Sequence, residues 1–259
     1  ALNRMITCQN LFSPLYLVCA LSACAANPTA EQPSTDFSEL QLTAGDLAAA
    51  TNQSAILDDF DPDDEVSWQV YVPDTASDAP APGLLVFISP SDSPGFPSDW
   101  LPVLDEKNLV MMAPIGVGNR QITSKRIALA VSGLIYFAQR YELDRSRFYL
   151  SGFSGGARVS GLTMALYPSL FSGAIYIGGA EMWPADTPPD VKEQLSSRRF
   201  VFLTGSNDFN RDMTRRVWGR YRRNGITQSK IDEVRRLGHE LPSASVFERT
   251  ISYLDGETN

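Results

Sequence analysis

The sequence predicts an α/β protein in which a mainly parallel sheet carries helices on both faces. From Glu65 onward, short β-rich runs alternate with helical patterns, an order typical of parallel sheets. The run at residues 84–88 is apolar throughout, as expected of a strand covered on both faces. No second composition regime follows Glu65, and 43% hydrophobic residues among 259 suffice for a core. We expect one such domain, at residues 46–259.

Seven runs rich in β-branched, aromatic and other apolar residues are the expected strands: 66–72, 84–88, 109–113, 148–151, 174–177, 200–204 and 231–237. Apolar residues at helical spacing predict helices over 127–138, 157–166, 211–223 and 247–254. The helix at 211–223 carries six arginines, which we interpret as a solvated face because Met213, Val217 and Tyr221 share one side. The acidic stretch at 58–64 is expected to be a solvated turn.

Charge and composition exclude several classes of function. Lys plus Arg number 22 against 30 Asp plus Glu, a net charge of -8 that disfavours a nucleic-acid partner. The sequence has a single histidine, and its three cysteines are confined to the first 24 residues, a composition that argues against a zinc site. It also contains no phosphate-binding loop motif. We therefore expect neither a metal nor a cofactor.

The N-terminal segment resembles an export signal. Cys8, Cys19 and Cys24 all lie in the first 24 residues. The same stretch holds an apolar run at residues 11–23, which is too short to span a bilayer permanently but has the length of a signal-peptide core. Leu21-Ser22-Ala23-Cys24 resembles the lipobox of bacterial lipoproteins, which predicts a signal peptide at 1–23, an acylated Cys24 and a tether at 24–45. Ordinary cleavage after an A-x-A site is the alternative. Either outcome places the chain in the periplasm or cell envelope, anchored to the membrane if the lipobox is used.

A sharp strand-to-helix turn carries the candidate nucleophile. The strand at 148–151 runs into Gly152-Phe153-Ser154-Gly155-Gly156 and then into a helix. A serine on such a turn needs neighbours without bulky side chains, and the glycines supply that room. The N–H of Gly155 and the positive end of the helix dipole would stabilise an oxyanion.

A serine hydroxyl needs a base and a group that orients the base. The only histidine, His239, follows the last expected strand. Asp208 follows the preceding strand, so both would reach the same edge of the sheet as Ser154. Asp212, inside the next helix, and Asp186, after an earlier strand, are expected to be solvated.

With these motifs the chain resembles the α/β-hydrolases, specifically the esterases grouped with polyhydroxybutyrate depolymerases and feruloyl esterases. The resemblance covers residues 66–254 and is carried by the segments 149–157, 167–174 and 238–242. It implies cleavage of small or oligomeric carboxylic esters without a cofactor, with Ser154 as nucleophile, His239 as base and Asp208 as its partner.

The loop after residue 88 departs from that family, which usually carries a histidine-glycine pair there. Here Ser89-Pro90-Ser91 follows, and Pro90 has no N–H to donate. The backbone N–H of Ser91 is then the expected second oxyanion donor beside Gly155, with Ser89 the second choice.

Two other functions stay open from the sequence. The chain could be a non-catalytic surface lipoprotein that uses the fold as a binding module, or a serine peptidase. Trp100 and Trp183 lie in proline-containing loops near the expected site, where they would either line a subsite or pack in the core.

Overall fold

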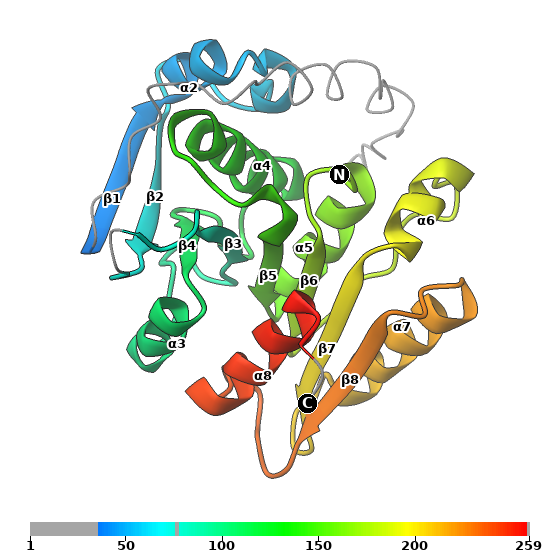
Figure 1. The fold of residues 1–259 in the computed structure, drawn as a ribbon. Helices are drawn as coiled ribbons and strands as arrows, with labels where there is room; N and C mark the ends of the chain where they lie inside the picture. Colours follow the sequence, from blue (N-terminus) through cyan, green and yellow to red (C-terminus); the bar gives the residue numbers. More distant parts are fainter. Residues whose placement is uncertain (1–35, 76–77, 258–259) are drawn as a thin grey trace.

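A single eight-stranded sheet organises the computed structural model, which describes residues 36–75 and 78–257 (Figure 1). Its order is β1-β2-β4-β3-β5-β6-β7-β8. β2 pairs antiparallel with both β1 and β4, and all other neighbours are parallel, which confirms the mainly parallel sheet. The strands are β1 (Asp36–Thr43), β2 (Glu65–Val72), β3 (Gly83–Ile88), β4 (Leu109–Pro114), β5 (Phe148–Phe153), β6 (Gly173–Ile177), β7 (Arg199–Gly205) and β8 (Ser229–Val234).

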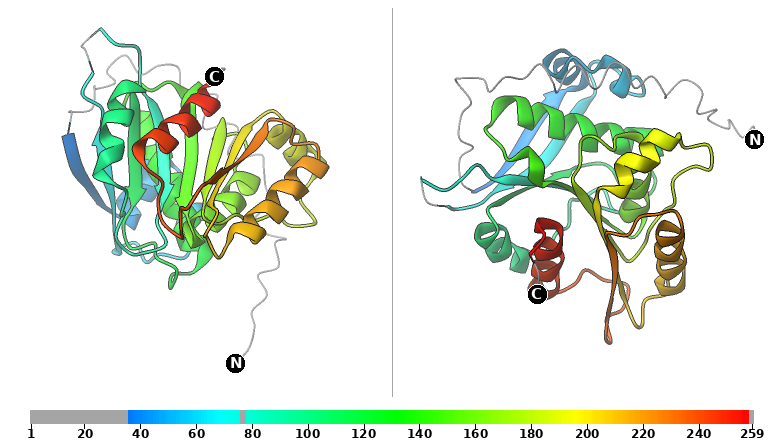
Figure 2. Two further views of the ribbon diagram at one scale, coloured as in Figure 1. Left: turned by 90° about the horizontal axis from the view of Figure 1, so that it is seen from below. Right: turned by 45° about the vertical axis from the view of Figure 1, so that its right-hand side comes forward.

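Helices cover both faces of the sheet, as the sequence predicts. Side chains of successive residues in β5 point to opposite faces, so Leu150 joins the core under one layer and Tyr149 the core under the other. One layer consists of α3 (Leu101–Glu106) and α8 (Ala244–Asp255) (Figure 2). The opposite layer contains α2 (Ala44–Thr51), α4 (Thr123–Arg140), α5 (Gly155–Leu166), α6 (Pro189–Ser196) and α7 (Arg211–Arg223).

The seven expected strands are present, and one needs a corrected end. The strand expected at 231–237 is β8, which begins at Ser229 and ends at Val234. The chain turns at Arg236, whose φ is 63°, and the carbonyl of Leu237 accepts a hydrogen bond from the N–H of Asn207. Residues 235–237 therefore support the segment that follows β7 instead of extending the sheet.

The tether expected at 24–45 is wrong for its second half. Residues 36–43 form the edge strand β1, in which Leu40 and Leu42 alternate with polar residues and pack against the core. The Thr43 hydroxyl accepts a hydrogen bond of 3.0 Å from the N–H of Asp46 and so caps α2. The expected signal peptide and Cys24 lie outside the described residues.

The two loop tryptophans pack in the core, one on each face of the sheet. Trp100 is fully buried and stacks on Phe247 with ring centroids 4.0 Å apart. Trp183 packs against Tyr221 of α7 with centroids 4.6 Å apart. On α7, Val217 and Tyr221 are buried, which confirms that one side of the arginine-rich helix faces the core. Across residues 36–75 and 78–257, no helix is long and apolar enough to cross a membrane.

Candidate active site

Ser154 lies on a strained turn between β5 and α5. Its φ of 54° and ψ of -117° form a backbone conformation that few non-glycine residues adopt. The turn is possible because backbones approach closely around it: a Cβ on Gly156 would overlap the carbonyl oxygen of Ile88, and one on Gly152 would meet Gly156. The N–H of Ser154 donates to the carbonyl of Ile177 on β6 at 2.8 Å, which fixes the turn against the sheet.

The structure brings Ser154, His239 and Asp208 into one hydrogen-bonded chain. His239 Nε2 is 2.8 Å from Ser154 Oγ, and His239 Nδ1 is 2.9 Å from Asp208 Oδ1. A proton on Nδ1 satisfies both bonds, because Nδ1 then donates to the carboxylate and Nε2 accepts from the hydroxyl. The three residues follow the carboxyl ends of β5, β8 and β7, and those ends meet at one edge of the sheet.

The carboxylate of Asp208 is held by further hydrogen bonds. Its side chain is only 2% exposed, Oδ1 accepts the N–H of Asn210 at 2.8 Å, and Oδ2 accepts the Thr204 hydroxyl at 3.2 Å. Asn210 also donates from Nδ2 to the carbonyl of Gly178. These contacts hold Asp208 in one orientation toward the imidazole of His239.

Two phenylalanines flank the imidazole, and no sequence pattern predicts this contact. The ring of Phe153 lies 4.8 Å and that of Phe209 4.1 Å from the ring of His239, centroid to centroid. Phe209 is 78% exposed, so this aromatic ring forms part of the rim of the site. Each phenylalanine neighbours a predicted site residue in sequence, Ser154 or Asp208.

The two expected oxyanion donors have different surroundings. As the first residue of α5, Gly155 has an N–H that no carbonyl within the helix accepts. The N–H of Ser91 donates to Ser89 Oγ at 3.1 Å, so it already has an acceptor. Asn119, which no sequence motif indicates, lies against Gly155: a Cβ on that glycine would contact the Asn119 side-chain amide.

Two loops meet over the start of α5. The N–H of Asn119 donates to the carbonyl of Pro90 at 2.9 Å, and the N–H of Gly116 donates to the carbonyl of Asp92 at 2.7 Å. Asp92 Oδ1 also accepts the N–H of Gly118, and this bond together with Arg120 holds the pKa of the Asp92 carboxyl below its ordinary value. The loops after β3 and β4 therefore form one hydrogen-bonded unit.

A pocket of about 440 Å³ opens beside Ser154. It lies between α4, α5 and α7, near the N-terminus of each, and its walls combine polar and apolar side chains. This volume lies in the usual range for small-molecule sites. The lining residues are Asn119, Thr123, Arg126, Ser154, Gly155, Arg158, Val159, Leu162, Glu181, Asn210 and Met213.

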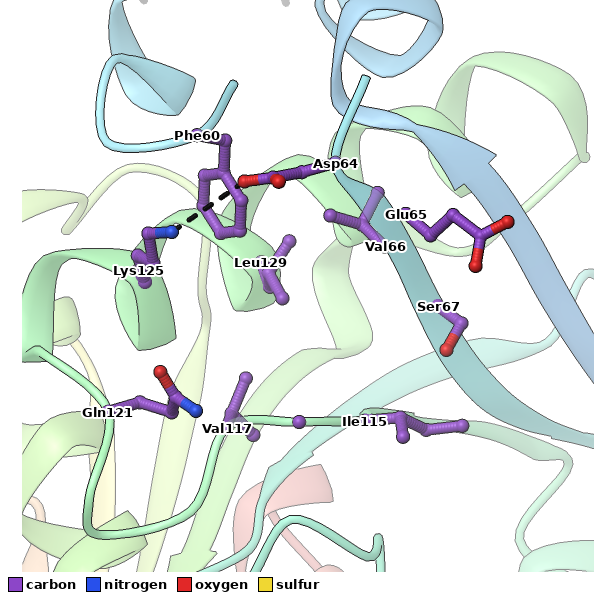
Figure 3. Close-up of a pocket in the computed structure, with 11 residues that line it drawn as sticks. Phe60, Asp64, Glu65, Val66, Ser67, Ile115, Val117, Gln121, Lys125 and Leu129 are labelled. Carbon is purple, nitrogen blue, oxygen red and sulfur yellow. Dashed lines mark ion pairs between the residues drawn. The ribbon is translucent and has the colours of Figure 1, made fainter. Parts of the chain in front are cut away.

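A second pocket of about 300 Å³ lies on the other side of α4 (Figure 3). Lys125 lines it, forms an ion pair of 3.7 Å with Asp64 and lies 4.5 Å above the ring centroid of Phe60. None of the three hydrogen-bonded site residues lines this pocket. Among the residues that the structure describes, no cluster of three or more potential metal ligands occurs.

Comparison with known proteins identifies the fold. No family model matches the chain, and no curated protein sequence matches it. Among solved structures, a ferulic acid esterase aligns with a TM-score of 0.62 and 14% identity over 87% of this chain and 100% of that one. An esterase of the archaeon Pyrobaculum calidifontis gives 0.60 and 10% over 92% and 87%. The S-formylglutathione hydrolase of Staphylococcus aureus gives 0.58 and 12% over 88% and 100%. From this likeness and the sheet order, the chain has the α/β-hydrolase fold.

Proposed function

We propose that the chain is a serine-dependent carboxylic ester hydrolase. The observation that carries this proposal is the unbroken chain of hydrogen bonds from Asp208 through His239 to Ser154, with distances of 2.9 and 2.8 Å. It has the arrangement of nucleophile, base and orienting carboxylate that acyl transfer requires. The fold supports the proposal as well, because the solved structures similar to this chain include enzymes named as esterases.

The reaction would proceed through an acyl-enzyme. Ser154 Oγ attacks the ester carbonyl carbon while His239 Nε2 takes the hydroxyl proton, and Asp208 stabilises the imidazolium that forms. The tetrahedral intermediate then loses its alcohol, which takes the proton from His239. Water, deprotonated by the same imidazole, attacks the acyl carbonyl, and the acid leaves as Ser154 regains its proton.

The oxyanion of both tetrahedral intermediates would bind the N–H of Gly155, with the dipole of α5 adding to its stabilisation. Ser91 stays the proposed second donor, and it would first have to exchange the bond of its N–H to Ser89 Oγ. Asn119 is a further candidate for this role, because its side-chain amide lies against Gly155.

The test is loss of reactivity in Ser154→Ala. Wild type should hydrolyse short-chain 4-nitrophenyl esters and be labelled by a fluorophosphonate, and the variant should do neither. Ser160→Ala is the matched control, because Ser160 lies in α5, the helix that follows Ser154, and its hydroxyl bonds only backbone carbonyls. Labelling that persists in Ser154→Ala would contradict the proposal. Failure of the wild type to react would instead favour the non-catalytic binding module, against which the 2.8 Å between Ser154 and His239 argues.

A finer substrate class rests on the sequence resemblance alone. We propose esters of the polyhydroxybutyrate depolymerase and feruloyl esterase type as the first substrates to test. A panel of acyl lengths, feruloyl esters, hydroxybutyrate oligomers and aminoacyl amides would rank them. Cleavage of the amides in preference to the esters would indicate that the chain is a serine peptidase and not an esterase.

We also propose export to the periplasm or cell envelope, with a lipid anchor on Cys24. The apolar run at 11–23 and the motif Leu21-Ser22-Ala23-Cys24 support this proposal. Metabolic labelling with an alkynyl fatty acid should mark the wild type and not Cys24→Ala. An exported but unlabelled wild type would mean ordinary signal cleavage.

A further inference from the structure

The N-termini of three helices contribute positive electrostatic potential to the pocket beside Ser154. Thr123 and Arg126 line it from the first turn and a half of α4, Gly155 begins α5, and Asn210 immediately precedes α7. Each helix N-terminus carries a partial positive charge of roughly half a unit, and the effect reaches about one turn. A pocket bounded by three such ends favours an anionic ligand.

Arg126 adds a full charge that has no counter-ion. The residue is 4% exposed, and its Nη2 donates to the carbonyl of Ser89 at 3.1 Å. Its buried Nε has no hydrogen-bond partner, and no carboxylate of the described residues forms an ion pair with it. Burial lowers the pKa of this guanidinium, and the attraction of Asp92 opposes the effect. Arginine nevertheless stays protonated, so a charge is buried here without a pair.

The other charged residues that line the pocket pair with each other. Arg158 and Glu181, which both line it, form an ion pair of 2.7 Å. Asp92 pairs with Arg120 at 3.3 Å and accepts the N–H of Gly118. In the described part of the chain, Arg126 is therefore the pocket cation left for a ligand.

The neighbouring residue Lys125, unlike Arg126, has a carboxylate partner. It lines the second pocket on the other side of α4, where Asp64 neutralises it and Phe60 lies beneath it (Figure 3). Two cations in the first turns of one helix oppose its dipole, so neither is there to stabilise the helix. Lys125 has its own acid within reach, and Arg126 does not.

We infer that Arg126 forms a subsite for a carboxylate of the substrate, so that the esters cleaved at Ser154 are anionic. The inference rests on the proposed ester hydrolysis and adds the charge of the substrate to it. A guanidinium with unused N–H groups suits a carboxylate, because its planar donors match the two oxygens. The remaining polar wall, from Thr123 and Asn119, adds uncharged hydrogen-bonding groups.

The test compares esters that differ only by a carboxylate or its isosteric amide. Mono-4-nitrophenyl adipate and 4-nitrophenyl adipamate place this group on the acyl side, and 4-carboxyphenyl and 4-carbamoylphenyl butyrate place it on the alcohol side. In wild type, kcat/KM should be at least tenfold higher for the anionic member of one pair. Arg126→Gln should remove that preference and Arg126→Lys should restore part of it, whereas Lys125→Gln should leave it unchanged.

Equal kcat/KM within both pairs in wild type would overturn the inference and leave the ester hydrolase intact, because the neutral esters are still cleaved. An equal loss for both members of a pair in Arg126→Gln would also overturn it, since Arg126 would then act only by holding the loop at Ser89. If none of the four esters is cleaved, the proposed function fails. Titration calorimetry of adipate binding then tests whether Arg126 forms a carboxylate subsite. Binding to wild type that is lost in Arg126→Gln would support it, and no binding to wild type would overturn it.

Discussion

Trp100 Nε1 donates a hydrogen bond of 2.9 Å to the carbonyl of Pro242, three residues beyond His239. The indole also stacks on Phe247 of α8 and meets Phe87 of β3 edge to face. The loop that carries the only imidazole is therefore tied at its far end to the core of the α3 and α8 layer. A residue far along the chain from His239 is thus bonded to the loop that carries it.

Replacing Trp100 should affect both stability and activity. Trp100→Phe keeps a ring in the core but leaves the buried carbonyl of Pro242 without its donor, which should lower the free energy of unfolding by about 1–3 kcal/mol. We expect kcat for 4-nitrophenyl butyrate to fall as well. Trp183→Phe is the control, because Trp183 packs on the opposite layer against Tyr221. Denaturant unfolding and steady-state kinetics of both variants check this. An unchanged kcat in a destabilised Trp100→Phe would show that the tie has no role in positioning His239.

Asp208→Asn should impair chemistry and leave the fold intact. The amide keeps the size of the side chain but favours the wrong tautomer of His239, and comparable changes lower kcat by about 10⁴-fold. Asp212→Asn and Asp186→Asn are matched controls that should retain wild-type kcat, because neither carboxylate is among the hydrogen-bond partners of His239. Thermal unfolding of all three variants verifies folding. Wild-type activity in Asp208→Asn would remove this carboxylate from the mechanism.

Glycine at position 156 should be required by the packing of the turn. Gly156→Ala puts a methyl group onto the carbonyl oxygen of Ile88, and overpacking of this kind costs about 1–3 kcal/mol of unfolding free energy. Gly219→Ala should instead stabilise the protein by about 0.5–1 kcal/mol, because Gly219 is inside α7 and the nearest atom to its added methyl group is the mobile end of Arg223. Chemical denaturation of the two variants measures both changes in the free energy of unfolding, a decrease for Gly156→Ala and an increase for Gly219→Ala. A stable Gly156→Ala with full activity would contradict the close approach of the two backbones.

Tyr176 should make the fold sensitive to alkali. Burial raises the pKa of its phenol well above the ordinary value, with the Tyr221 hydroxyl 3.2 Å away. Folding favours the neutral phenol of Tyr176. The contribution of this group to the free energy of unfolding is therefore fully present below about pH 10, the pKa of an unfolded tyrosine, and is lost as the pH rises above it. In Tyr176→Phe the free energy of unfolding should fall less steeply above that pH, by about 1.4 kcal/mol per pH unit. Urea unfolding between pH 8 and 11 measures both slopes, and parallel slopes would refute the prediction.

Much of the fold could be predicted because its signals are local. A strand such as β3 consists of six buried residues in an unbroken apolar run. The glycines around Ser154 predict a tight turn without any information from the rest of the chain. The positions of Asp208 and His239 followed from chain order, since the carboxyl ends of parallel strands meet at one edge. The edge strand β1 was missed even though Leu40 and Leu42 alternate with polar residues, because a proline-rich and serine-rich stretch precedes it.

The sequence by itself determined the tight glycine-rich turn at Ser154, the chain order of the three candidate site residues and the alternation of strands and helices, because each depends on neighbours along the chain. Only the tertiary structure decided that Asn119 lies against Gly155, that Phe209 covers His239 and that Arg126 faces the pocket without a counter-ion. The bond from Arg126 to Ser89 spans 37 residues and that from His239 to Ser154 spans 85. Such contacts, and the absence of a partner for a buried charge, arise from how the whole chain packs, which no local pattern encodes.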